Sequence, residues 1–175
     1  MDQEPKQVIT EFLFDDEWTN AKAGTIHFLQ QRSLPHSQIY AVTFDNKKGQ
    51  QRWLCIVIQD EQGHWYLQSA GPLGEAIASS TRNYPWVNLA AGNSNIFWAG
   101  GSVITRGFDV KRVRLISTKG EILEDTVQDN LVMFLSSQPL QWPLQVELHD
   151  AKEAVVGSHT FPLPHTFPLH FNPEV

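Results

Sequence analysis

The sequence predicts a mainly β protein, an antiparallel β-sandwich of about eight or nine strands with a short N-terminal helix. Two observations lead to this fold class. Runs of β-branched and aromatic residues are separated at hairpin spacing by short polar turns, and one later segment alternates apolar and polar residues strictly. The chain has 175 residues, of which 41% are hydrophobic, so it is long enough to bury a core without disulfides.

Three polar turns connect the strands that we expect in the middle of the chain. The turns are Asn46-Lys47-Lys48-Gly49, Asp60-Glu61-Gln62-Gly63 and Thr118-Lys119-Gly120. A tight turn that closes on a residue with positive φ favours glycine at its last position, so this pattern predicts antiparallel hairpins. The strands expected beside these turns are 39–44, 52–58, 64–69, 110–117 and 121–127.

The later part of the chain has strands of two kinds. Leu144–His149 alternates apolar and polar residues, as in a strand with one face on a core and one in water, and 154–158 is expected to return beside it. Residues 53–58 and 131–135 are apolar at successive positions, which predicts interior strands buried on both faces. A further strand is expected within 96–104.

The N-terminal residues have a mixed pattern. Val8–Phe14 is interpreted as a strand, and the acidic run 15–17 stands where an N-cap and first helical turn favour acids. Apolar positions then keep helical spacing at Trp18, Ala21, Thr25 and Leu29, which predicts a short helix that ends before Pro35. We therefore expect a strand and helix segment over 1–34, packed on a sandwich of 35–175, in a single domain overall.

The charge of the chain excludes some partners. A net charge of −6 argues against nucleic acid, because phosphate binding needs a surplus of basic residues. The basic cluster Lys111, Arg112 and Arg114 is interpreted as a solvated sheet face, with an anion patch as the weaker alternative. No stretch has the length and apolarity of a membrane span, and the first residues do not resemble an export signal. We expect no membrane partner and a cytoplasmic protein, although a chain trimmed of its signal would look the same.

Motifs for catalysis do not occur in the sequence. It has no Gly-x-Ser-x-Gly, His-Glu-x-x-His, Gly-x-Gly-x-x-Gly or phosphate-loop pattern. The single cysteine, Cys55, is flanked by Leu54 and Ile56 and is interpreted as an inert core residue. We predict no catalytic residue and no cofactor.

The C-terminal tail repeats His-Thr-Phe-Pro-Leu at 159–163 and 165–169. In an extended chain His159 and His165 would lie roughly 20 Å apart, too far to share one metal ion, so we predict no metal site. The prolines suit an edge strand or extended tail. Phe161 and Phe167 are then expected to enter apolar hollows of the same domain or of a second subunit.

One long connection, 71–95, is the place where we expect a ligand site. It carries Arg82, Tyr84 and Trp86, and Trp98 follows it. Connections of this length are often binding loops, and aromatic rings beside an arginine stack on flat ligands. The alternative, which we favour, is that Pro85-Trp86-Val87 closes the open end of the sandwich.

Two motifs occur in an order that is typical of known proteins. Val110–Leu115 has the pattern V-x-R-V-R-L, and Pro143–Asp150 has the pattern P-x-x-V-x-L-x-D. This arrangement resembles uncharacterised bacterial β-sandwich proteins, over the chain from Gly63 onward. The resemblance implies a fold and no functional residues. Those proteins usually carry glycine at the end of the turn after the aspartate, where this chain has Glu153.

Three functional hypotheses follow. The leading one is a non-enzymatic module that binds another protein or self-associates, since catalytic motifs are absent and the tail suits pairing across a sheet edge. The second is a carbohydrate or small-ligand binder that uses Tyr84, Trp86 and Trp98. The third is a hydrolase whose catalytic triad is assembled only in the fold.

Overall fold

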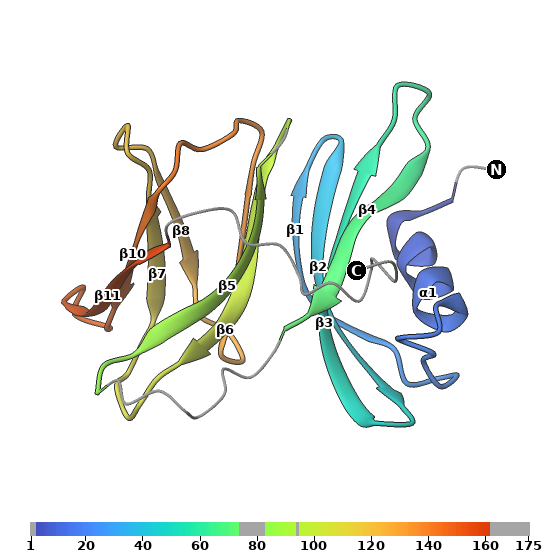
Figure 1. Cartoon of the computed structure of the whole chain (residues 1–175), viewed down its shortest axis with the longest axis horizontal. Helices are drawn as coiled ribbons and strands as arrows, with labels where there is room; N and C mark the ends of the chain where they lie inside the picture. Colours follow the sequence, from blue (N-terminus) through green and yellow to red (C-terminus); the bar gives the residue numbers. More distant parts are fainter. Residues whose placement is uncertain (1–2, 74–82, 94, 162–175) are drawn as a thin grey trace, which may run out of the picture. The chain divides into compact units, whose positions relative to one another are not determined.

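The computed structural model describes residues 3–73, 83–93 and 95–161. It is mainly β, with one helix and eleven strands in three antiparallel sheets over these residues (Figure 1). The predicted fold class is therefore confirmed, although eight or nine strands was too low a number. The chain divides after Leu73 into two compact units, which are described separately below.

The first unit is a four-stranded sheet with a helix on one face (Figure 1). Its elements are α1 (Pro5–Asp15), β1 (His27–Leu34), β2 (Ser37–Asn46), β3 (Gly49–Gln59) and β4 (Trp65–Pro72). The strands pair in chain order, each antiparallel to the next. The boundary predicted at residue 34 coincides with the end of β1, and the division into compact units comes after Leu73. Hairpin pairing is local, so the spacing of turns did not show how the strands group into units.

Helix α1 replaces the predicted strand over Val8–Phe14. Pro5 at the start of the helix, Ile9 and Leu13 recur every four residues and are buried, so one helical stripe enters the core. That core also contains Tyr40, Val42, Phe44, Trp53, Cys55, Val57 and Ala70. The apolar run 8–14 is compatible with the period of a strand and with the period of a helix. The helix forms because it packs its buried stripe against the sheet.

The helix predicted over Trp18–Leu29 does not form. The carboxylate of Asp16 accepts hydrogen bonds from the backbone N–H groups of Trp18 and Thr19, at 2.9 and 3.3 Å. Aspartate therefore organises a turn at the end of α1, not the start of a new helix. The chain then takes a positive φ at Asn20, and β1 begins at His27.

The second unit is a seven-stranded β-sandwich. Its elements are β5 (Trp86–Asn93), β6 (Phe97–Ile104), β7 (Arg112–Ile116), β8 (Ile122–Thr126), β9 (Leu131–Ser136), β10 (Leu144–His149) and β11 (Val155–Phe161). One sheet has the order β5-β6-β9 and the other β11-β10-β7-β8. Side chains from both sheets share a single hydrophobic core, as in two antiparallel sheets that pack face to face.

Burial agrees with the predicted strand types. The run Trp53–Val57 in β3 and the run Leu131–Phe134 in β9 are buried at every residue, as expected of strands covered on both faces. Within the sheets β3 is an interior strand, whereas β9 is an edge strand. In β10, Leu144, Val146 and Leu148 point into the core. The alternating strand and the continuously apolar strands are therefore both confirmed.

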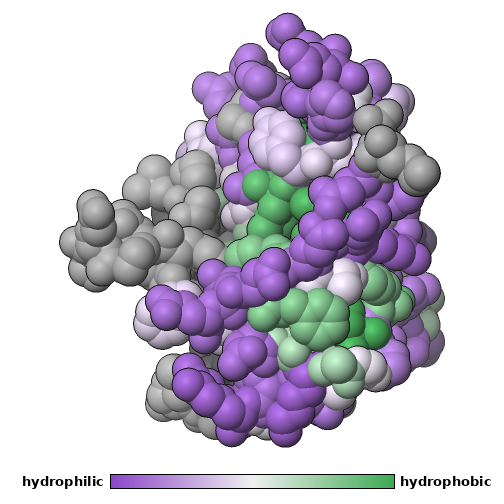
Figure 2. All heavy atoms as spheres, turned by 90° about the vertical axis from the view of Figure 1, so that its right-hand side faces the viewer, coloured by the Kyte–Doolittle hydropathy of each residue, from purple (hydrophilic) through white to green (hydrophobic). Residues whose placement is uncertain are grey.

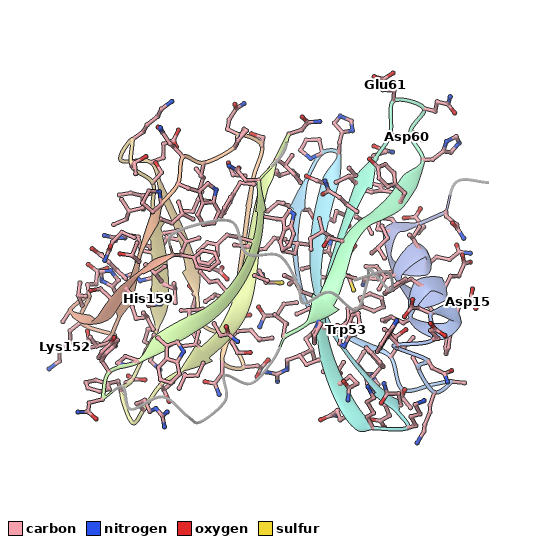
Figure 3. All side chains as sticks on the ribbon, viewed as in Figure 1. Asp15, Trp53, Asp60, Glu61, Lys152 and His159 are labelled. Carbon is pink, nitrogen blue, oxygen red and sulfur yellow. The ribbon has the colours of Figure 1, made fainter. Side chains whose placement is uncertain are left out.

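Three turns share one kind of hydrogen bond. A side chain at the end of the preceding strand or at the start of the turn accepts backbone N–H groups ahead of it: Asp60 from Gln62 and His64, Ser117 from Lys119 and Glu121, and Asp150 from Lys152 and Ala154. Asp60 and Glu61 stand at the tip of the β3–β4 hairpin (Figure 3). The turns close on positive φ at Gly49, Gly63 and Gly120, and on Glu153 after Asp150. The glycine-ended hairpins are thus confirmed.

Candidate functional site

The two tryptophans of the predicted aromatic site are buried within the second unit. Trp86 in β5 is 5% exposed and Trp98 in β6 is 3% exposed. Trp98 lies so close to Gly92 that a Cβ there would approach its Nε1 to 2.3 Å. The guanidinium of Arg106 is 5.0 Å from the centre of the Trp86 ring. These rings do not form an open stacking surface; Tyr84 is 40% exposed, and Arg82 lies outside the described residues.

The segment Pro85-Trp86-Val87, which leads into β5, packs inside the second unit. Pro85, Trp86 and Val87 are all buried. The Val87 N–H donates to Nε2 of His159 in β11, which Figure 3 labels, across 3.2 Å. Gly157 lies close against the Pro85 carbonyl. The start of β5, an edge strand of one sheet, is therefore bonded to β11, an edge strand of the other sheet.

Of the two tail phenylalanines, the structure describes one. Phe161 ends β11, and its ring centre is 5.2 Å from that of Trp142 in the same unit. Phe167 lies outside the described residues, as does the second copy of the repeat. His159 uses its Nε2 lone pair to accept the Val87 N–H, which leaves that nitrogen unsuited to a metal ion. No group of three or more metal-binding side chains gathers within the described ranges.

The basic cluster on β7 is neutralised by carboxylates. Arg112 pairs with Glu124 at 2.7 Å and also with Glu153, and Arg114 pairs with Glu124 at 2.8 Å. Hydrogen bonds from Arg114 and then Arg112 hold the pKa of Glu124 below its usual value. Lys111 pairs with Asp109 at 2.9 Å. The interpretation as a solvated, paired sheet face fits these contacts better than an anion patch does.

Cys55 in β3 is fully buried in the core that the first sheet shares with α1. Burial raises the pKa of its thiol, because the thiolate would have to leave water. A nucleophilic role at this position is therefore unfavourable.

A hollow of about 320 Å³ lies in the first unit, between the connection from α1 to β1 and the turn from β2 to β3. Its lining residues are Glu17, Trp18, Lys47 and Lys48. Trp18 is 43% exposed, and the ammonium of Lys48 is 5.9 Å from the centre of its ring. Figure 2 shows the face of the molecule that carries α1, where apolar surface lies on both sides of a hydrophilic band.

Buried hydrogen bonds fix the two walls of this hollow to one another. Asn46, at the end of β2, donates from its side-chain amide to the Thr19 carbonyl at 2.9 Å. The Thr19 hydroxyl donates to the Leu13 carbonyl in α1 at 2.9 Å, and the Lys48 N–H donates to the Asn46 side chain at 2.8 Å. Thr19 and Asn46 are both buried, so the two bonds that Thr19 makes are shielded from water. The backbone on both sides of the hollow is therefore preformed.

The charges that line the hollow contrast with those on β7. Within the described part of the chain, neither Lys47 nor Lys48 has a carboxylate within 4.0 Å of its ammonium group. Glu17 has no cationic partner among the described residues within that distance either. Charged groups of both signs beside a partly exposed indole give stacking, hydrogen-bond donors and a hydrogen-bond acceptor in one place.

Sequence reasoning did not find this site. It placed Trp18 on a helix and Lys47 and Lys48 in a turn, without joining them. Thr19 and Asn46 hold the two segments together, but the sequence does not show that these polar residues are buried.

No protein-family model and no curated protein matches this chain. In the described ranges, no helix has both the length and the apolarity needed to cross a membrane.

Proposed function

We propose that this protein is a non-enzymatic binding module that holds a small, ring-bearing ligand of the carbohydrate type in the hollow beside Trp18. One observation carries the proposal: a partly exposed indole lies in a preformed hollow among polar side chains of both signs. Sites for small molecules combine an aromatic surface with a few fixed polar groups in this way. A volume of about 320 Å³ suits one sugar ring or a pair of them.

The lining of the hollow favours binding over catalysis. It offers one carboxylate, Glu17, and no histidine, cysteine or serine among the described residues. Hydrolysis of a glycosidic bond normally uses a pair of carboxyl groups on opposite sides of the bond. The proposal therefore follows the non-enzymatic hypothesis but moves the site from the connection before β5 to the first unit.

Self-association through the tail receives less support. Phe161 packs against Trp142 within its own unit and is thus already engaged. We favour the hollow because its four lining residues are described and its frame is defined by hydrogen bonds.

The proposal is tested by screening a saccharide array and measuring the affinity of each hit by titration calorimetry. We expect Trp18→Ala to weaken binding by about tenfold or more, since it removes the stacking surface. Tyr66→Ala and Tyr84→Ala are matched controls, because these aromatic side chains have similar exposure and lie outside the hollow. Retention of full affinity by Trp18→Ala, with loss in Tyr84→Ala, would instead favour the connection before β5.

A further inference from the structure

We propose that the ligand of the hollow is an acidic saccharide, whose ring stacks on Trp18 while its carboxylate pairs with Lys47 and Lys48. This inference rests on the binding function proposed above and adds the charge of the ligand. The lining has two ammonium groups and one carboxylate, so it is locally cationic on a chain whose net charge is −6.

The two lysines are available to an anion in a way that the basic residues of β7 are not. Arg112 and Arg114 already bind Glu124, whereas the lysine ammonium groups of the hollow have no such carboxylate within the described residues. Asp16, whose carboxylate accepts the Trp18 N–H at 2.9 Å, lies close to the lining, but more distant acidic groups act weakly, because salt screens exposed charges beyond about 8–10 Å. The local charge of the lining therefore decides which ligands are attracted.

The position of Lys48 relative to Trp18 matches the shape of a uronic acid. Its ammonium lies over the Trp18 ring, 5.9 Å from the ring centre, so the charge is adjacent to any sugar ring that stacks on the indole. In a uronic acid the carboxylate is bonded directly to the sugar ring. When the ring stacks on the indole, the carboxylate is therefore close to the Lys48 ammonium. Glu17 can accept hydrogen bonds from ring hydroxyls, and it repels a carboxylate, so it orients the acid toward the lysines.

A phosphorylated ligand fits the hollow less well. The hollow adjoins the C-terminal end of α1, where the helix dipole gives a partial negative charge. Phosphate sites are usually built from helix N-termini and free backbone N–H groups, but the Lys48 N–H is already bonded to Asn46. A singly charged carboxylate suits this lining better than a multiply charged phosphate.

The test compares oligouronates with their methyl esters, which keep the ring and the linkage but remove the charge. The panel contains galacturonate, glucuronate and mannuronate trisaccharides, each with its ester, together with adenosine monophosphate, all measured on the full chain by calorimetry. We expect at least one acid to bind about tenfold or more tightly than its ester, and its affinity to fall as salt is raised.

Charge variants separate this inference from the proposed function. Replacing Lys47 and Lys48 together by Met removes the ammonium groups but keeps long side chains, and should abolish the preference for the acid, so that acid and ester then bind with about equal affinity. Lys22→Met is the control, since Lys22 is exposed in the same unit but does not line the hollow.

The possible outcomes separate the inference of an acidic ligand from the proposed binding function. Equal affinity for acid and ester, with loss of both in Trp18→Ala, would overturn the acidic ligand and keep the binding function. Tighter binding of adenosine monophosphate than of any uronate would also overturn it. If no saccharide of either charge binds, the proposed function itself fails.

Discussion

The side-chain amide of Asn46 donates a hydrogen bond to the backbone carbonyl of Thr19 across 2.9 Å, in the buried interior of the first unit. This bond joins the connection after α1 to the turn between β2 and β3, two segments far apart in the sequence. Trp18 precedes one end of the bond and Lys47 follows the other, so the position of the hollow depends on it.

Asn46→Ala should lower the free energy of unfolding by about 2 kcal/mol, because it leaves the Thr19 carbonyl and the Lys48 N–H without their partner. Thr19→Val should cost less, about 1 kcal/mol, since Ala21 still donates to the Leu13 carbonyl that the hydroxyl contacts. Urea unfolding of both variants measures the difference. A larger cost for Thr19→Val than for Asn46→Ala would contradict the assigned role of Asn46.

Glu153 occupies a backbone conformation with φ of 63°, in the left-handed region that favours glycine. Glycine adopts this region without strain, whereas alanine is less stable there by about 1 kcal/mol. Glu153→Gly and Glu153→Ala both lose the ion pair with Arg112, so comparing them isolates the backbone effect. We expect the glycine variant to be the more stable by about 1 kcal/mol in chemical unfolding. Equal stability would show that the left-handed conformation costs nothing here.

Glu124 should make the stability of the second unit depend on pH. Arg114 and Arg112 lower its pKa in the folded protein. Such a carboxylate stabilises the fold at pH above its unfolded pKa, about 4.3, and this contribution is lost as the pH falls through the lower, folded value. The stability difference between the native protein and Glu124→Gln should therefore shrink from pH 7 to pH 3. Since these groups are near the surface, high salt should reduce it as well. A difference that grows on acidification would refute the assignment.

Gly157 allows β11 to approach the Pro85 carbonyl. A Cβ at this position would lie 2.4 Å from that oxygen, so the backbone would have to move. Gly157→Ala should destabilise the protein by about 1–3 kcal/mol, as overpacking does. Ser158→Ala, at an exposed neighbouring position, is the control and should have little effect. Wild-type stability in Gly157→Ala would show that the two sheet edges are not held together here.

Local patterns were enough to predict the hairpins, because each depends on residues close in sequence. Asp60, Ser117 and Asp150 bond to N–H groups two and four residues ahead, and these contacts need no other part of the fold. The alternating pattern of β10 also predicted which of its side chains face the core, because successive side chains of a strand point to opposite faces. His149 is the exception: it is buried, and its ring bonds with Glu147 and the Glu153 carbonyl.

Features that depend on distant residues were not predictable. The run at 8–14 fits a strand or a helix, and the burial of Ile9 and Leu13 against β2 and β3 decides for the helix. The aromatic residues near β5 suggested a site, but the exposure of a ring depends on what packs around it. Trp86 and Trp98 are buried, whereas Trp18 is half-exposed. Only the fold joins Trp18 to the two lysines of the hollow.

The most direct test of the central claim is to map ligand binding by nuclear magnetic resonance on the labelled full chain. We predict that the saccharide selected by the array will shift the indole N–H of Trp18 and the backbone amides of 16–20 and 46–49, while those of 83–87 stay unchanged. Shifts confined to residues 83–87, with the Trp18 indole unmoved, would contradict the assignment of the hollow as the binding site.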